Sequence, residues 1–179
     1  MNLPGKKTNI YTNIRDNCKQ LVEGTVLVVD PSIGSMSSMP GWAAYIGGLL
    51  QDSGTLEIDL PQATETPRWV RLKQVYQQLR NLSTGWKPDV CIYEEVPVSA
   101  HAGRSQVSHA SLLNAVGVTM AAIDANKFVG IPPISWKRYV PEDYVKGDEE
   151  DAIQMGRIVI EMAREILATD PPRKYRSNV

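Results

Sequence analysis

The 179-residue sequence lacks several features that mark common classes of protein. No apolar stretch reaches the roughly 18 residues that a membrane-spanning helix needs. The first residues, MNLPGKKTNIYTN, lack the apolar centre of a secretory signal. The sequence also has no internal repeat and no glycine-rich phosphate loop followed by lysine, which disfavours a nucleotide-binding ATPase. We therefore expect a protein of an intracellular, reducing compartment that does not bind membranes.

Cysteine is also scarce, and the chain has no excess of positive charge. Cys18 and Cys91 are far apart, and no Cys/His spacing suggests a zinc site. Cys91 stands in an apolar run and is expected to be a buried thiol. The net charge of −1 counts against a protein that simply coats DNA. It does not exclude a nuclease, because clustered active-site carboxylates lower the formal charge and bound metal ions offset them.

What the sequence does contain is enough apolar residues, 42%, for one domain with a real core. A β-branched run at 25–29 predicts a strand buried on both faces. The patterns predict further strands at 42–48, 55–60, 90–93 and 128–131, helices at 67–83, 105–124 and 148–168, and a helical turn at 135–140. The first three strands follow one another closely, which favours an antiparallel meander.

The order βββαβαβα predicts an α/β fold, with a mixed five-stranded sheet and helices on both faces. Residues 24–168 form the predicted domain. Residues 1–23 are an N-terminal extension, either an arm or a short helix. Residues 169–179 are a basic tail, which is either a solvated segment or a contact for nucleic acid.

Acidic residues occur where three of the predicted elements end or begin. Asp30 ends the first strand, Glu94 ends the fourth, and Asp148 and Asp151 open the last helix. Residues three apart share one face of a helix, so both aspartates can point at the sheet edge that carries Asp30 and Glu94. Carboxylates gathered in this way repel one another, and Mg²⁺, which prefers oxygen ligands, would relieve the repulsion. Two such ions about 4 Å apart can promote hydrolysis of a phosphodiester.

Each acid also has a structural explanation when it is taken alone. An aspartate after a strand is often a turn former, and acids at the start of a helix are favoured by the helix dipole. Glu94 and Glu95 could simply mark the solvated end of a strand. The combined placement at three separate elements favours a metal site.

Several short motifs, in this order, resemble the RuvC-type Holliday-junction resolvases of the ribonuclease H-like superfamily. Asp-Pro and a small residue follow the first strand, and Gly-aromatic-small opens the second. An apolar-Glu-x-Val segment stands on the fourth strand, and the last helix carries Asp-x-x-Asp-Ala. The matching segments are 30–32, 41–43, 93–96, 117–122 and 148–152, within a resemblance that spans about residues 25–165.

The resemblance implies a ribonuclease H-like fold and a homodimer that cuts four-way DNA junctions, in the cytoplasm of a bacterium or of a phage-infected host cell. It implies two Mg²⁺ or Mn²⁺ ions held by Asp30, Glu94, Asp148 and Asp151. The family also uses basic residues after the fifth strand to hold phosphates. The nucleic-acid contacts would come from Lys137, Arg138, Arg104 and His101.

The sequence departs from the family pattern at several points. The loop after Asp30 is longer, Glu95 stands beside Glu94 so that either could be the ligand, and the loop 97–104 lacks the aromatic residue that the bacterial enzymes insert into the junction. Two alternatives stay open. One is a ribonuclease H-like nuclease acting on an RNA–DNA hybrid or a replication intermediate, and the other is a non-catalytic DNA-binding module with a decayed site.

Overall fold

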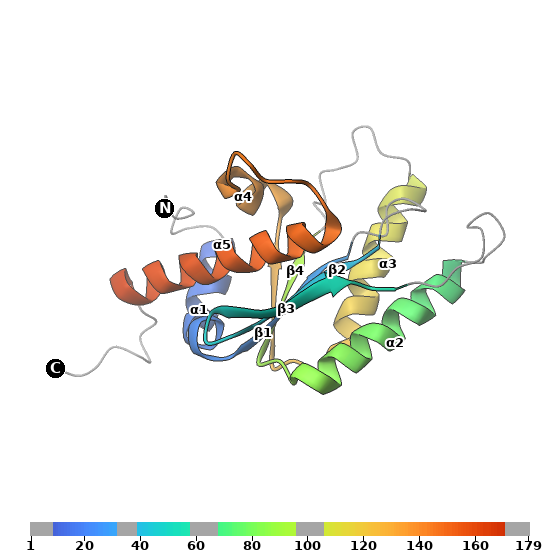
Figure 1. The fold of residues 1–179 in the computed structure, drawn as a ribbon, viewed down its shortest axis with the longest axis horizontal. Helices are drawn as coiled ribbons and strands as arrows, with labels where there is room; N and C mark the ends of the chain where they lie inside the picture. Colours follow the sequence, from blue (N-terminus) through green and yellow to red (C-terminus); the bar gives the residue numbers. More distant parts are fainter. Residues whose placement is uncertain (1–8, 32–38, 58–67, 96–105, 171–179) are drawn as a thin grey trace.

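The computed structural model describes residues 9–31, 39–57, 68–95 and 106–170, which form a sheet with helices on both faces (Figure 1). The predicted order of strands and helices is confirmed, with a further helix before the first strand. The elements are α1 (Asn9–Glu23), β1 (Thr25–Asp30), β2 (Gly41–Ile46), β3 (Leu49–Thr55), α2 (Arg68–Trp86), β4 (Val90–Glu94), α3 (Gln106–Ala122), β5 (Lys127–Ile131), α4 (Pro133–Trp136), the 3₁₀ turn η1 (Lys137–Tyr139) and α5 (Asp148–Thr169).

The five strands lie in the order β3-β2-β1-β4-β5. β1, β2 and β3 pair antiparallel, as the predicted meander requires, whereas β4 and β5 run parallel to β1. The carboxyl ends of β1, β4 and β5 therefore meet at one edge of the sheet. In open α/β sheets this edge is the usual place for a functional site.

The predicted third strand at 55–60 was wrong in position. β3 is Leu49–Thr55, and residues 58–60 lie outside the described residues. Gly47 and Gly48, with φ of 59° and 73°, form the tight turn that joins β2 to β3. A two-residue Gly-Gly turn is a strong hairpin signal, because glycine adopts positive φ without strain. The predicted second strand, 42–48, contains both glycines, and the third strand was predicted from the alternating pattern at 55–60 instead.

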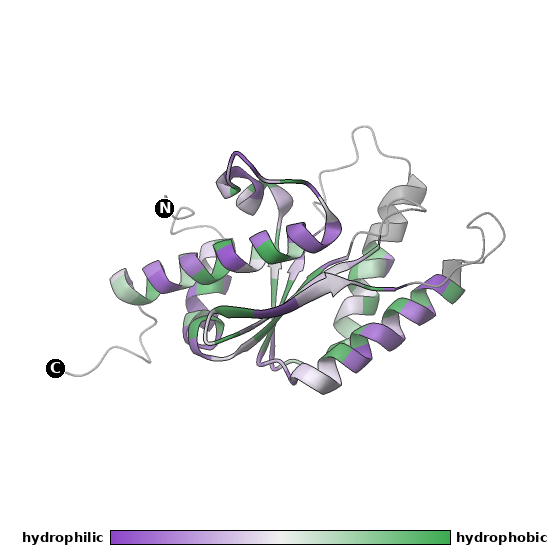
Figure 2. Ribbon diagram, in the orientation of Figure 1, coloured by the Kyte–Doolittle hydropathy of each residue, from purple (hydrophilic) through white to green (hydrophobic). Residues whose placement is uncertain are grey.

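Side chains of the central strands pack into two separate hydrophobic cores, one on each face of the sheet. Val26 and Val28 of β1 pack with α1 and α5 on one face, while Leu27 and Val29 pack with α2 and α3 on the other. Successive strand residues point to opposite faces, so a strand covered on both sides must be apolar at every position. Figure 2 shows the apolar colouring of these inner strands. The prediction that β1 is buried on both faces is confirmed.

The packing of α5 on the sheet leaves no room for a side chain at residue 156, which is a glycine. A Cβ atom at Gly156 would lie 2.5 Å from Cε2 of Tyr45 and 2.8 Å from Cγ2 of Val28. The hydroxyl of Tyr45 in β2 donates a 2.6 Å hydrogen bond to the carbonyl oxygen of Ile153 in α5, which ties the helix to β2. This contact fixes where the first turn of α5 meets the sheet.

Residues 9–23 form the helix α1, the second of the two possibilities that the sequence left open for the N-terminal extension. Tyr11, Ile14, Cys18 and Leu21 are buried in the same core as α5. The Tyr11 hydroxyl donates a 2.9 Å hydrogen bond to Oδ2 of Asp170 just after α5. The thiols of Cys18 and Cys91 are both fully buried, which confirms the prediction for Cys91. The basic residues after Asp170 lie outside the described residues.

Candidate active site

The two strand-end acids lie side by side on one face of the sheet. Asp30 is the last residue of β1 and Glu94 the last of β4, and these strands are parallel neighbours. Val28 and Ile92, two residues earlier on each strand, point into the core beneath α5. Because the alternation has a period of two, Asp30 and Glu94 face the same side as α5. Asp30 is buried, with 2% of its surface exposed.

The first turn of α5 packs against the end of β1 and the beginning of β2. Gly41 pairs with Asp30 across the two strands, and a Cβ atom at Gly41 would lie 1.7 Å from the carbonyl oxygen of Asp148. Only glycine leaves room for this approach of helix to strand. One turn further along α5, Asp151 is buried, with 4% of its surface exposed.

The first three acids of α5 have different hydrogen-bond partners. Oδ2 of Asp148 accepts a 3.1 Å hydrogen bond from the backbone N–H of Met39, and Oε1 of Glu149 accepts one of 2.7 Å from the Ser53 hydroxyl. Glu150 accepts a hydrogen bond from Gln154 on the same helix. The N-cap residue, Gly147, has no side chain to cap the helix. Capping does not explain this acidic turn, although the helix dipole still favours it.

The ammonium group of Lys137 lies in the middle of the carboxylates. Its Nζ is 3.2 Å from Oδ2 of Asp151 and 3.5 Å from Oε2 of Glu94. The same Oε2 accepts a 3.1 Å hydrogen bond from the indole N–H of Trp136, whose ring centroid is 4.9 Å from Nζ. The short helix α4, which begins at Pro133 after β5, brings both residues to this edge of the sheet.

The electrostatics of the cluster reflect burial and mutual attraction. Burial raises the pKa of Glu94, and the nearby Asp151 adds to the rise, whereas Lys137 and the Trp136 N–H oppose it. Partial burial alone would lower the pKa of Lys137. The carboxylates of Glu94, Asp151 and Asp30 outweigh that effect and raise it, so the ammonium stays charged at neutral pH.

The type of the donor atoms suits a divalent cation, although the arrangement of the described residues around Lys137 does not yet form a metal site. Oδ1 of Asp151 is buried and accepts no hydrogen bond from the described part of the chain, which is costly for a carboxylate that has no further partner. Carboxylate oxygens are the preferred ligands of Mg²⁺ and Mn²⁺. Among the described residues, no three acidic, histidine or cysteine side chains are arranged to hold a metal ion, and the carboxylates surround Lys137 instead.

The structure therefore brings Asp30, Glu94, Asp151 and Lys137 together and sets the first turn of α5 beside them. The Asp148 side chain turns toward the backbone of Met39. Glu95, the alternative to Glu94, is exposed. Arg138 is exposed, with its guanidinium 4.7 Å from the Tyr139 ring, and His101 and Arg104 lie outside the described residues.

Trp136 has a role that the sequence did not reveal. Its side chain is fully buried. Its hydrogen bond to Glu94 was missed, because no local pattern connects a tryptophan after β5 with the end of β4. The pairing of β4 with β5 creates that contact.

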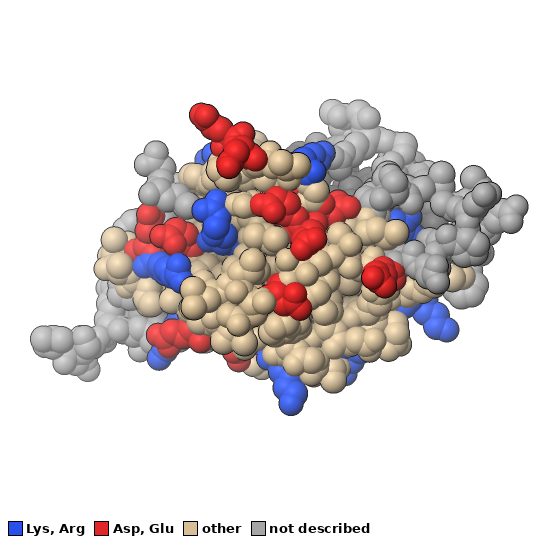
Figure 3. Space-filling view, in the orientation of Figure 1, with Lys and Arg blue, Asp and Glu red and all other residues tan. Residues whose placement is uncertain are grey.

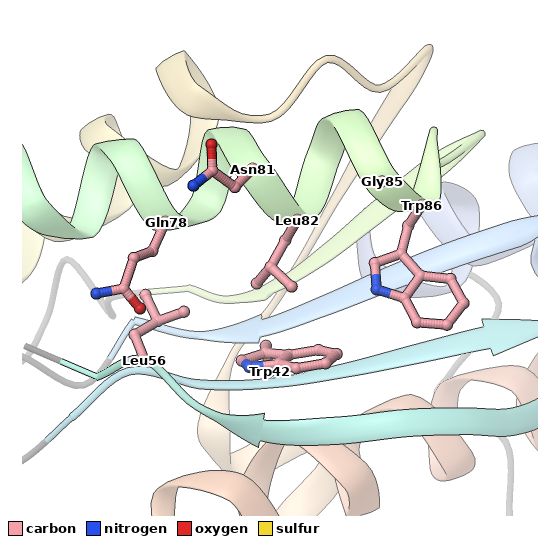
Figure 4. A pocket seen from close by; sticks show the side chains of 7 residues that line it. All are labelled: Trp42, Leu56, Gln78, Asn81, Leu82, Gly85 and Trp86. Carbon is pink, nitrogen blue, oxygen red and sulfur yellow. The ribbon is translucent and has the colours of Figure 1, made fainter.

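A groove of about 400 Å³ lies on the opposite face of the sheet, between β2 and α2. Figure 4 shows Leu82 pointing from α2 toward the Trp42 indole, with Trp86 beside it. None of the residues that line the groove is ionisable, so its surface offers packing contacts and no acid–base or metal chemistry. The lining residues are Trp42, Leu56, Gln78, Asn81, Leu82, Gly85 and Trp86.

Acidic side chains gather on the surface over the start of α5 (Figure 3). Asp148, Glu149 and Glu150, in the first turn of that helix, are all partly exposed. A polyanion such as DNA would be repelled by this patch, unless cations or basic side chains offset it. None of the described helices is long and apolar enough to cross a membrane.

The arrangement of strands, helices and acids defines a class of α/β fold, and comparison with solved structures identifies that class. No protein-family model and no curated protein matches the sequence. The structure of T. thermophilus RuvC in complex with a Holliday junction substrate matches with a TM-score of 0.55 and 12% identity, over 80% of this chain and 94% of that chain. A second Thermus thermophilus RuvC structure matches with a TM-score of 0.50 and 14% identity, over 80% and 95% of the two chains.

At this level of identity the likeness establishes the fold and nothing finer. The chain has the ribonuclease H-like fold of the RuvC structures, with the mixed five-stranded sheet that the sequence predicted. The predicted fold class is confirmed.

Proposed function

We propose that this chain is a metal-dependent endonuclease that cuts four-way junctions or other branched DNA. The observation that carries the proposal is the meeting of Asp30, Glu94 and Asp151 at the carboxyl ends of two parallel strands. The fold adds support, because one of the similar structures is RuvC in complex with a Holliday junction substrate.

In this proposal Asp30, Glu94, Asp148 and Asp151 hold two Mg²⁺ or Mn²⁺ ions. Such ions supply an activated water and stabilise the leaving oxygen of a phosphodiester. Neighbouring residues would hold these carboxylates in position. Trp136 fixes one oxygen of Glu94 through its indole N–H, and the Gly41 contact holds the first turn of α5 in place.

The basic residues have the complementary role of binding phosphates. Lys137 lies within the carboxylate cluster and Arg138 is exposed beside it, which supports the proposal that both contact the scissile phosphate. His101 and Arg104 remain proposed DNA contacts on the basis of sequence alone. A chain with a net charge of −1 would bind DNA through these few cations and its bound metal ions.

We further propose that the active form is a homodimer, because paired cuts in a junction need two active sites. Leu113 and Met120, which are seven residues apart and so share one side of α3, are 51% and 44% exposed. Exposed large apolar side chains at neighbouring places are typical of an interface. Sedimentation at micromolar concentration should give a dimer, and a monomer there would argue against paired cutting.

The proposed activity is tested with a synthetic mobile four-way junction incubated with Mg²⁺, with Mn²⁺ and with EDTA. We expect cleavage with either ion and none with EDTA. Asp30→Asn should lower the rate by more than about 100-fold while junction binding persists, because the substitution removes a ligand charge and leaves the basic residues intact. Full activity in this variant would contradict the metal-site argument.

The same assay separates the proposed substrate from its alternatives. A replication fork, a linear duplex and an RNA–DNA hybrid are cut in parallel with the junction. Preference for the hybrid would redirect the proposal to a ribonuclease H activity. Absence of both cleavage and Mn²⁺ binding would point to a non-catalytic module.

A further inference from the structure

Lys137 occupies the place between the carboxylates where a cation would be held. We propose that Lys137 is the internal counter-ion of the metal-free site and that a divalent ion binds by displacing its ammonium group. This inference rests on the proposed metal-dependent function. It gives Lys137, which is not a metal ligand, a role in setting the affinity of the site for metal.

The first step of the argument concerns charge. The acids Asp30, Glu94 and Asp151 are at least partly buried together. Like charges held close together repel one another strongly in a medium of low dielectric. The Lys137 ammonium lies 3.2 Å from one of them and 3.5 Å from another. Among the described residues, it is the one cation that forms an ion pair with these acids.

The second step concerns which partner can move. The side chain of Lys137 is 39% exposed, whereas those of Glu94 and Asp151 are 18% and 5% exposed. The lysine therefore approaches the cluster from the solvent side, on a stem of four flexible carbons. It can swing outward without unpacking the core, whereas the two carboxylates cannot leave.

The third step concerns what keeps the site in shape after the lysine leaves. The fully buried Trp136 holds Oε2 of Glu94 by a hydrogen bond that does not involve Lys137. Oδ1 of Asp151 is buried and accepts no hydrogen bond from any described residue. A divalent ion that replaced the ammonium would find one oriented carboxylate and one carboxylate with a free oxygen.

The test measures Mn²⁺ binding to the full chain without DNA, by calorimetry and by electron paramagnetic resonance of free Mn²⁺. Lys137→Met keeps the stem and removes the charge, so we expect Mn²⁺ to bind on the order of tenfold more tightly. Lys137→Arg keeps the charge and should stay within about threefold of the wild type. The control is Lys127→Met, which removes an equal charge from the first residue of β5, at the other end of the sheet, and should leave the affinity unchanged.

A second measurement follows the lysine itself. Reductive methylation of the amine at Lys137, quantified by mass spectrometry, should proceed faster when Mn²⁺ is bound, since displacement frees the ammonium from its ion pairs. The exposed Lys127 serves as the internal reference, and its rate should not change.

The outcomes separate this inference from the proposed function. Equal or weaker Mn²⁺ binding by Lys137→Met, with clear binding by the wild type, would overturn displacement and leave the metal site standing. Slower methylation of Lys137 with Mn²⁺ would also overturn it. Absence of Mn²⁺ binding in both proteins would overturn the inference and the metal-dependent function together.

Discussion

At the scale of single residues, the structure separates neighbours that look equivalent in the sequence. Glu94 and Glu95 are adjacent acids, but Glu94 turns toward Trp136 and Lys137 on the α5 face. Glu95 is exposed, and its backbone N–H donates to the carbonyl oxygen of Ile131 in β5. The alternation of a β-strand is the physical reason, because successive side chains leave opposite faces of the sheet.

This difference predicts unequal effects of two matched substitutions. Glu94→Gln should lower the metal-dependent cleavage rate by more than about 100-fold, because a ligand should matter at least as much as the outer contacts that orient it. Glu95→Gln removes the same charge one residue away and should lower the rate by less than about threefold. Cleavage of a labelled junction measures both, and a larger loss from Glu95→Gln would exchange their roles.

The acidic turn at the start of α5 gives a second example at this scale. Asp148 and Asp151 were expected to point together, since they are three residues apart. Asp151 lies in the cluster and forms an ion pair with Lys137. The Asp148 side chain instead accepts a hydrogen bond from the backbone N–H of Met39, just before β2. A shared helix face is therefore not enough to decide which atoms a side chain meets.

At the scale of elements, the position of α5 against the sheet decides where the site forms. The helix packs directly on the strands because Gly156 leaves room for Tyr45 and Val28, and because Gly41 leaves room for the backbone of Asp148. Larger residues at either place would push the first turn of α5 outward. The acids on that turn would then lie farther from Asp30 and Glu94.

Gly156→Ala should destabilise the protein by about 1–3 kcal/mol, because the added methyl group overlaps a ring held by its hydrogen bond to Ile153. Gly117→Ala is the matched control, since it also lies in a helix but has open space around its Cβ position. It should stabilise by up to about 1 kcal/mol through helix propensity. Urea unfolding gives both values, and equal effects would contradict close packing at Gly156.

The contact between α1 and the end of α5 predicts a dependence on alkaline pH. Burial and the hydrogen bond to Asp170 raise the pKa of Tyr11, so the folded state holds its proton more firmly than the unfolded state. The resulting stability is fully present below the ordinary tyrosine pKa of about 10 and is lost as the pH rises through the folded value.

Tyr11→Phe should therefore cost about 1 kcal/mol at pH 8 and less above pH 10, where the wild type loses its advantage. The free energy of unfolding of both proteins is measured across this range. A constant difference between them at every pH would show that ionisation of Tyr11 is not coupled to folding.

At the scale of the whole molecule, α1 is part of the common core. Its buried residues Tyr11, Ile14, Cys18 and Leu21 pack with α5 and the sheet. Each large buried apolar side chain contributes about 1.5–3 kcal/mol, and a domain has only about 5–15 kcal/mol in total.

Removal of residues 1–23 should therefore leave a chain that is unfolded or close to it. Circular dichroism and limited proteolysis of the truncated and full chains measure this. A truncated protein with unchanged thermal unfolding would mean that α1 is only an accessory.

The sequence by itself determined the order of elements, the burial of β1 on both faces and the identity of the acids at the strand ends. These properties depend on local periodicity and on residue type, which a single chain displays directly. The hairpin was misplaced because the alternation at 55–60 competed with the Gly47-Gly48 turn, and only pairing with β2 decides between them.

Tertiary structure alone decided the surroundings of the acids. That Lys137 lies between Glu94 and Asp151, and that Trp136 donates to Glu94, depends on β1, β4 and β5 running parallel and on α5 packing against β1 and β2 at Gly156. These contacts join residues that are 14, 42 and 43 positions apart in the chain. No local pattern encodes them, because distances between distant side chains are set by how the elements pack.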